Sequence, residues 1–333
     1  MTEAAAPPMP GRPALRRRAL LAGLALGPAM AQAQPFADRP LKIIVAFAPG
    51  GGTDILTRIL APELTAQLGQ PVVIENRAGA ASTVGSDAVA KATPDGTTLL
   101  ASDSTFLINP GLFGPRLPYD TLRDFTGVTM LASAPVVLLA HPSVPFNDMP
   151  GLIAFARANP GRLNYGSGGN GSGTHLAGEL LKQVAGVDLT HVPYRGIAPA
   201  VNDLLAGNVQ LLFGGISSGR VHVEAGKLKA LALTGARRNS AMPSVPSFDE
   251  LGLRGVDAES WWGLYAPSGS PPAVLARVSA EAARALRKPA IAQRLAELGY
   301  EPLGNTPAEH TAQWHAMVAR WVEVIAKAGV QPD

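Results

Sequence analysis

Two glycine-rich segments of this sequence stand where a short apolar run gives way to a helical pattern. The first reads FAPGGGTD over residues 47–54. Glycine lets the backbone approach a ligand closely, and the free N–H groups at the start of a helix attract negative charge. No Gly-Lys-Ser or Gly-Lys-Thr follows, so the segment is not a P-loop. We expect it to cradle a small anion, although a tight strand-to-helix turn would also account for its glycines.

The second segment reads GSGGNGSGTH over residues 166–175. Its glycines match the Gly-x-Gly-x-x-Gly spacing of dinucleotide-binding folds, but Asp188 precedes the next strand instead of ending it, so the match is weak. A donor-rich loop that cradles a ligand fits better. His175 has no second histidine or carboxylate at metal-ligand spacing, which favours a local hydrogen-bonding role.

A third segment, GISSG over residues 215–219, has the Gly-x-Ser-x-Gly pattern of a nucleophile elbow. Ser217 is therefore the basis of an alternative hypothesis, an exported serine hydrolase. Such an enzyme needs a histidine beside its serine. His310 and His315 fall on a helical window with Trp314, which we expect to pack in the core. A histidine within hydrogen-bond reach of Ser217 would favour the hydrolase over a binding protein.

Polar residues also stand at two further strand ends, where open parallel sheets bind ligands. Residues 102–105 read SDST, and residues 194–199 read YRGIAP. Arg195 could offer its charge to a carboxylate, or it could equally pair with Asp203 or face solvent.

These segments belong to an alternation of short apolar runs and amphipathic windows that is typical of a parallel sheet wrapped by helices. The runs are nearly continuous in Val, Ile and Leu, which indicates burial on both faces. Strands are predicted over residues 41–48, 71–75, 97–101, 136–140, 163–165, 189–193, 209–213 and 228–234. Helices are predicted over residues 53–67, 173–185, 199–206, 271–287 and 307–328. The side chains of Thr53, Asp54 and Ser172 are expected to cap two of these helices.

The pattern restarts near Asn147 without a low-complexity linker. Two apolar segments that end in proline, 136–142 and 260–267, stand where the chain could cross out and back. We therefore expect an α/β fold of two doubly wound lobes joined by crossing strands, with a ligand cleft between them. On this interpretation lobe one comprises residues 36–138 and 262–333, and lobe two comprises residues 139–261.

The N-terminus has the charged, apolar and cleavable pattern of a signal peptide. Three arginines at 16–18 precede an apolar run over residues 19–29, which is too short to span a bilayer. Small residues around it predict cleavage after Ala31 or Ala33. We expect residues 1–33 to direct export to the periplasm, with the Sec route favoured over the twin-arginine route.

Composition excludes several classes of protein. The leader holds Arg12 and the arginines at 16–18 against Glu3, which accounts for the whole formal charge of +3. The remaining chain is formally neutral, so nucleic acid is not an expected partner. The absence of cysteine excludes disulfides, thiolate metal sites and a cysteine nucleophile. We expect neither a metal nor a cofactor.

Six ordered blocks resemble the Bug-type family of periplasmic solute-binding proteins, which serve tripartite tricarboxylate transporters. The blocks are PGGGTD (49–54), GQPVVIENRAG (69–79), PDG (94–96), GTHLAGEL (173–180), HVPYRG (191–196) and GKLKALA (226–232). They cover nearly the whole chain after the leader. The resemblance implies a monomer of periplasmic-binding-protein type, not an enzyme, that closes on a small organic acid and delivers it to the membrane subunits of the transporter.

The resemblance also implies that backbone amides and ordered water hold the ligand, which would be a dicarboxylate, a tricarboxylate, an amino acid or a related acid. The residues that it places at the ligand are Phe47, Ala48, Gly51, Gly52, Thr53, Asp54, Ser104, Thr105, Ser167, Gly168, Asn170, Gly171, Ser172, Thr174, His175, Arg195 and Ser217. This sequence departs from the family pattern twice. Gly214 and Gly215 stand where many members have an acidic residue, and Arg195 replaces the usual lysine, which leaves the identity of the ligand open.

Overall fold

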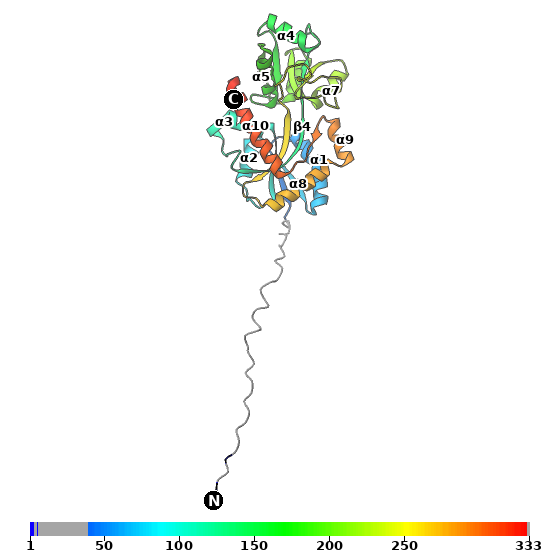
Figure 1. The fold of residues 1–333 in the computed structure, drawn as a ribbon. Helices are drawn as coiled ribbons and strands as arrows, with labels where there is room; N and C mark the ends of the chain where they lie inside the picture. The colour runs from blue at the N-terminus through cyan, green and yellow to red at the C-terminus, as the bar shows by residue number, and fades with distance from the viewer. Residues whose placement is uncertain (3–4, 6–38, 332–333) are drawn as a thin grey trace. The chain divides into compact units, whose positions relative to one another are not determined.

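The computed structural model describes residues 1, 2, 5 and 39–331, and residues 39–331 belong to one compact unit (Figure 1). The predicted signal peptide and its cleavage sites fall outside the described residues, apart from residues 1, 2 and 5. None of the described helices is long and apolar enough to cross a bilayer.

The compact unit is built on two sheets. The first has six strands in the order β11-β4-β10-β3-β1-β2, and the second has five in the order β7-β6-β8-β5-β9. The strands of the first sheet are β1 (Leu41–Val45), β2 (Val72–Asn76), β3 (Thr98–Asp103), β4 (Phe125–Ala134), β10 (Ser260–Pro267) and β11 (Glu301–Pro302). Those of the second are β5 (Val136–Ala140), β6 (Asn164–Ser167), β7 (Thr190–Pro193), β8 (Leu211–Gly215) and β9 (Lys229–Leu233). We call the part built on the first sheet the first lobe and the other part the second lobe.

Two connections join the sheets. Strand β4 leads through Pro135 directly into β5, and β10 brings the chain back to the first sheet after β9. The strands expected at both crossings are therefore present, whereas the exact division of the chain between the lobes remains a prediction.

The sheets are mixed and not purely parallel, which corrects the expected pattern. Strand β1 pairs in parallel with β2 and β3, but β10 runs antiparallel to both β3 and β4. In the second sheet β5 runs antiparallel to β8 and β9. The crossing strands are the ones that run against their neighbours. Strand β4 was not predicted, because its sequence FTGVTMLASA interrupts the apolar run with Thr, Gly and Ser.

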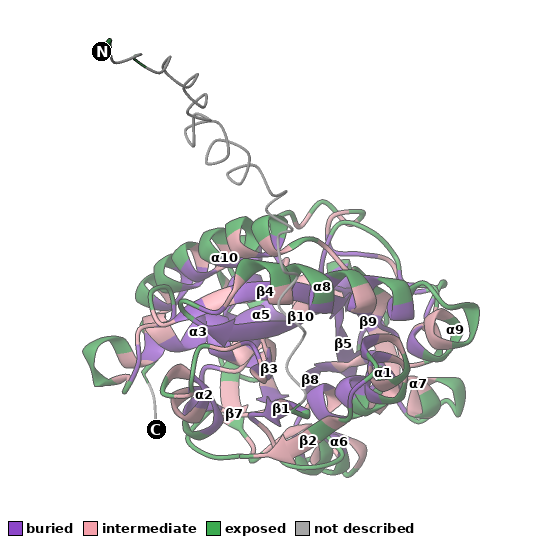
Figure 2. Cartoon of the chain, turned by 90° about the horizontal axis from the view of Figure 1, so that it is seen from below, coloured by how far each residue is buried: buried purple, intermediate pink, exposed green. Residues whose placement is uncertain are grey.

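Helices cover both sheets, and each of the five predicted helices begins within two residues of its predicted start. They are α1 (Gly52–Leu68), α2 (Thr83–Ala90), α3 (Ser104–Phe113), α4 (Met149–Ala158), α5 (Gly173–Ala185), α6 (Ile197–Leu205), α7 (Ile216–Glu224), α8 (Pro272–Leu286), α9 (Pro289–Glu297) and α10 (Pro307–Ala328). A short 3-10 turn, Gly114–Arg116, follows α3. Figure 2 shows α8 and α10 buried along one face and exposed along the other.

Helix α10 packs its buried face on the first sheet. It begins with a capping box, in which Thr306 and Glu309 each accept a backbone N–H of the other residue. Trp314 and Trp321 are almost fully buried, which confirms the predicted core role of these tryptophans. His310 is fully buried against β4 and β10, where Gly127 and Gly263 leave room for its ring: a Cβ at either position would lie about 3 Å from it.

Candidate functional site

Helix α1 begins with backbone N–H groups that have no partner. Its N-cap is Gly51, in an extended conformation and without a side-chain cap. No other described residue accepts a hydrogen bond from the N–H groups of Gly51, Gly52 or Thr53. The start of a 17-residue helix thus presents unpaired donors and the positive end of the helix dipole.

The predicted capping by Thr53 and Asp54 is wrong, because Asp54 turns toward the strands. Its buried carboxylate accepts hydrogen bonds from the Gly50 N–H, the Arg58 guanidinium and the Asn76 amide, each at 2.9 Å. Burial opposes ionisation, but these bonds hold the pKa of Asp54 below its ordinary value. Asn76 also donates to the carbonyl of Phe47 at 3.1 Å. Asp54 therefore fixes the glycine loop from within, and its oxygens are already occupied.

Two aromatic side chains lie over the first residue of α1. A Cβ built on Gly52 would lie 2.8 Å from the Tyr300 hydroxyl and 3.6 Å from Nε1 of Trp262. The two rings pack edge to face at 4.7 Å between centroids, and both side chains are more than nine-tenths buried. A side chain at position 52 would force the Tyr300 hydroxyl to move, so glycine leaves room for this packing. Sequence reasoning did not identify either aromatic residue.

Helix α3 starts beside α1. Asp103 is its N-cap and accepts the Thr105 N–H at 2.8 Å, and the hydroxyls of Thr105 and Thr53 also donate to it. Burial raises the pKa of Asp103 despite these bonds. The Ser104 hydroxyl accepts the N–H of Trp261 at 2.8 Å and so ties α3 to β10. Hydrogen bonds within the protein thus link Thr53 and Thr105 to Asp103, and Ser104 to β10, at the adjoining starts of α1 and α3.

The second glycine loop satisfies most of its own amides. The N–H groups of Gly168, Gly169 and Gly171 donate to Thr174 Oγ1, Ser167 Oγ and His175 Nδ1, respectively. Ser172 caps α5, as predicted, and also donates to the Gly169 carbonyl at 2.7 Å. Asn170 lies half-buried in the same loop. The donors that remain at the start of α5, within the described chain, are the N–H groups of Gly173 and Thr174.

His175 holds this loop in place. Its ring accepts the Gly171 N–H at 3.0 Å and stacks on His191, with the centroids 3.7 Å apart and the planes 5° apart. His191 in turn contacts Ser167 Oγ at 2.7 Å. Over the described residues no cluster of three metal-ligating side chains occurs.

The remaining predicted residues are exposed. Ala48 lies at the surface, and Arg195 is exposed without an ion pair in the described chain, since Asp203 accepts the Tyr194 hydroxyl at 2.7 Å. Ser217 borders a cavity of about 330 Å³ whose other charged lining residues are Arg220, Glu224, Arg294 and Glu297. No histidine lines that cavity, and no described histidine forms a hydrogen bond with Ser217.

The lobes contact each other near these helix starts. Leu112 of α3 contacts Gly171, and Ile216 at the start of α7 contacts Gly299, the neighbour of Tyr300. Helix α7, like α1, has a glycine N-cap without a side-chain hydrogen bond. The segment Gly299–Tyr300 thus contacts the start of α1 through the Tyr300 hydroxyl and the start of α7 through Gly299.

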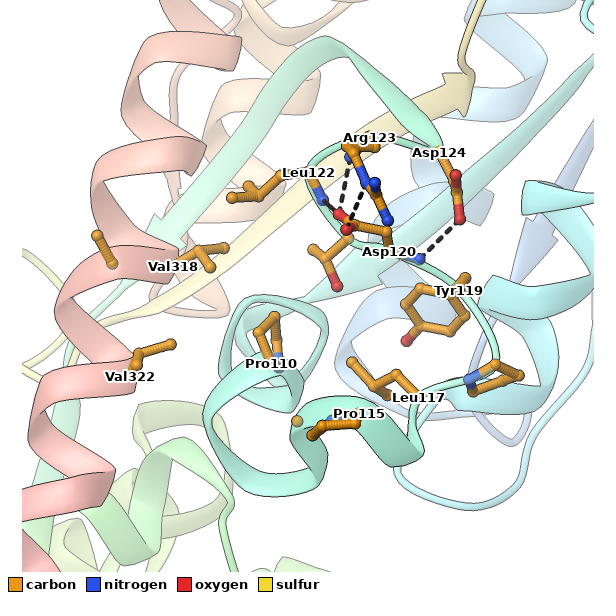
Figure 3. Close-up of a pocket in the computed structure, with 14 residues that line it drawn as sticks. Pro110, Pro115, Leu117, Tyr119, Asp120, Leu122, Arg123, Asp124, Val318 and Val322 are labelled. Atoms are coloured by element: carbon orange, nitrogen blue, oxygen red, sulfur yellow. Dashed lines mark hydrogen bonds and ion pairs between the residues drawn. The ribbon is translucent and has the colours of Figure 1, made fainter.

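A larger hollow of about 850 Å³ lies elsewhere, between α10 and the loop that carries Tyr119 and Asp120 (Figure 3). Apolar side chains such as Leu117, Val318 and Val322 form much of its wall. Asp120 faces Arg123, with which it forms an ion pair at 2.7 Å. This groove contains none of the residues predicted at the ligand.

Comparison with known proteins confirms the resemblance seen in the sequence. Residues 56–330 match the tripartite tricarboxylate transporter family receptor. The chain belongs to this family, and it has the two-lobed mixed α/β fold of periplasmic binding proteins.

Curated relatives extend over nearly the whole chain. It is 38% identical over 317 residues to the UPF0065 protein in the tcbD-tcbE intergenic region of Pseudomonas sp. (strain P51), with 93% of this chain and 94% of the relative covered. It is 35% identical over 300 residues to protein BugT of Bordetella pertussis (strain Tohama I), with 90% and 92% covered.

Solved structures give the same result. Periplasmic binding protein BugD superposes with a TM-score of 0.77 at 33% identity and covers 89% of this chain and 100% of its own. Rpa4515 of R. palustris, solved with adipate, gives 0.79 at 34% identity, with 89% and 99% covered. MatC from Rhodopseudomonas palustris, solved with bound malate, gives 0.75 at 34% identity, with 86% and 99% covered.

Proposed function

We propose that this protein is a periplasmic receptor that binds a small organic acid between its lobes and delivers it to the membrane subunits of a tripartite tricarboxylate transporter. The observation that carries the proposal is the start of α1, where the N–H groups of Gly51, Gly52 and Thr53 are unpaired. Two or three charge-assisted hydrogen bonds, each contributing roughly 1.5–3 kcal/mol, suffice to hold a carboxylate without a salt bridge.

The chemistry around these donors supports an anion and not a cation. The cationic side chain in the second turn of α1, Arg58, is engaged by Asp54. The uncapped start of α7 and the unpaired N–H groups of Gly173 and Thr174 provide further donors on the second lobe. A ligand with carboxylates at both ends would bridge the lobes, and adipate and malate, found in two relatives, are acids of this kind.

In this proposal the protein acts as a monomer after removal of residues 1–33, is exported by the Sec route, and needs no cofactor. The exposed Arg195 and Ser217 contribute at the edge of the site. The environment of Ser217, which lacks a histidine among the lining residues of its cavity, supports a binding protein over a serine hydrolase.

The test is a thermal-shift screen of the purified protein against adipate, malate, citrate, glutamate and benzoate, followed by calorimetry. A ligand at 100 times its Kd stabilises the folded state by about 2.7 kcal/mol, which raises the melting temperature by several degrees. Neutral sugars and amines are screened beside the acids, and a shift with these but with none of the acids would refute the proposal. In parallel, Ser217→Ala should leave the affinity unchanged within a few-fold, and ester hydrolysis that disappears in this variant would establish the hydrolase instead.

A further inference from the structure

Trp262 carries a buried hydrogen-bond donor that no described residue accepts. The side chain is 9% exposed, and Nε1 has no partner. Tryptophan N–H groups usually find a partner when they are buried, because an unpaired donor in a low-dielectric site is costly. The position of this donor therefore calls for an acceptor that the protein itself does not supply.

The donor lies at the start of α1. Nε1 would be 3.6 Å from a Cβ on Gly52, and the Tyr300 ring holds the indole from the side in an edge-to-face contact. The unpaired N–H groups of the first turn of α1 lie at the same place. The indole and the helix start are thus two independent sets of donors at one place, and the indole N–H can only donate.

Trp314 provides a contrast, because its Nε1 is also without a partner. Its fully buried indole packs edge to face against Tyr265 and His315, far into the core beneath α10. Aromatic faces accept a weak interaction from an N–H group and leave no room for a ligand. Trp262 also packs edge to face against one ring, that of Tyr300, but Gly52 at the start of α1 lies beside its nitrogen.

We infer that Trp262 donates its Nε1–H directly to the ligand carboxylate held at the start of α1, and that Tyr300 fixes the indole in the orientation for this contact. The inference rests on the proposed function and adds a side-chain donor to it. A carboxylate is the ligand group that fits, because it has only acceptors and here meets only donors from the backbone and the indole.

Trp261, the residue before Trp262 on β10, provides the matched control. Trp261 and Trp262 are consecutive residues of β10, so their side chains point to opposite faces of the sheet. Trp261 borders a separate cavity with Asp249 and Asp257. Replacing either tryptophan with phenylalanine removes one indole N–H and keeps an aromatic ring, but only one of the two changes affects the start of α1.

The experiment measures adipate and malate affinity by calorimetry for the wild type, Trp262→Phe and Trp261→Phe. We expect Trp262→Phe to weaken the acid that binds best by about tenfold or more, and Trp261→Phe to change it by less than twofold. If the wild type binds an acid and Trp262→Phe binds it equally well, the inference is overturned while the proposed function stands. If the wild type binds no carboxylate, the proposed function fails, and the inference fails with it.

A second measurement is independent of any loss of stability in the variant. The indole ¹H–¹⁵N resonance of Trp262 is the one that disappears from the Trp262→Phe spectrum. We expect this resonance in the wild type to shift strongly when the acid is added, while the resonance of Trp314 stays in place. An unmoved Trp262 resonance at saturating acid would contradict direct donation.

Discussion

Leu112 of α3 occupies the space that a side chain on Gly171 would need. A Cβ built on Gly171 would lie 2.1 Å from Cδ1 of Leu112, and Gly171 also has a positive φ of 67°. The two residues belong to different lobes, so this contact forms where the second glycine loop meets the first lobe. The absence of a side chain at Gly171 thus allows the two lobes to approach each other and allows the loop its left-handed backbone conformation.

Gly171→Val should therefore abolish binding of the acid, with a loss of at least about a hundredfold in affinity measured by calorimetry. The valine would strain the left-handed backbone and push α3 away from the loop. Gly173→Ala is the control, because a Cβ there meets nothing within 4 Å and its φ is not positive. Its affinity should stay within about threefold of wild type. Normal binding by a folded Gly171→Val protein would show that the lobe contact is dispensable.

Arg195→Ala should weaken binding by no more than about tenfold, which corresponds to roughly 1.4 kcal/mol. The arginine is exposed, and solvent screens its charge from the unpaired helix start. Arg195→Lys, which keeps the charge, should restore most of the affinity if the effect is electrostatic. If Arg195→Ala abolishes binding while Gly171→Val is tolerated, a cationic clamp and not the backbone holds the acid.

Asp103→Asn should stabilise the protein at neutral pH. Burial raises the pKa of Asp103, so the folded state favours the protonated form more than the unfolded state does. The stability gained from this proton is full below the ordinary pKa and is lost as the pH rises through the raised one. Asparagine needs no proton and can still accept the Thr105 N–H.

The melting temperature of Asp103→Asn should therefore exceed that of wild type by a few degrees at pH 7 and match it near pH 4. The acid should also bind the variant at least as tightly as wild type, because the side chain that contacts Thr53 at the start of α1 can no longer carry a negative charge. A variant that is less stable than wild type at every pH would show that the carboxylate acts mainly as a helix cap.

His310→Phe should make the protein less sensitive to acid. Burial lowers the pKa of His310 to about 3, whereas the unfolded chain takes up the proton near pH 6.5. Stability is therefore lost as the pH falls from about 6.5 toward 3, by up to roughly 1.4 kcal/mol per pH unit. Urea unfolding at pH 7 and pH 5 should show a smaller loss for the variant than for wild type. Equal losses would mean that other groups dominate acid unfolding.

Much of the fold could be predicted because its signals are local. The apolar run Val136–Ala140 and the helices Gly173–Ala185 and Pro307–Ala328 lie at their predicted positions, since Gly, Pro and capping residues mark their ends. Strand β4 could not be recognised, because it is buried among neighbours that come much later in the chain. Its polar residues are satisfied by tertiary partners, as when Thr129 donates to the Asn305 carbonyl at 2.8 Å.

The candidate site was predicted in part for the same reason. The glycine loops and their helix starts are local features, whereas the role of Asp54 depends on Asn76 from a neighbouring strand. The pair Trp261 and Trp262 did carry a signal, since one of two consecutive strand residues must face away from the other. Which of them contacts Gly52 depends on the order of strands in the sheet, and that order cannot be inferred from a local sequence pattern.

Strand β10 lies between β3 and β4 and is the only described strand that joins them. Until residues 260–267 are synthesised, β4 has no partner strand in the first sheet, and β3 leaves the three-stranded part with an open edge. A nascent chain that ends before Ser260 therefore has no complete first lobe, and closing it requires a contact between distant parts of the sequence, which is slow to form. Such late assembly would suit the Sec route proposed above, in which the polypeptide stays unfolded until it has crossed the membrane.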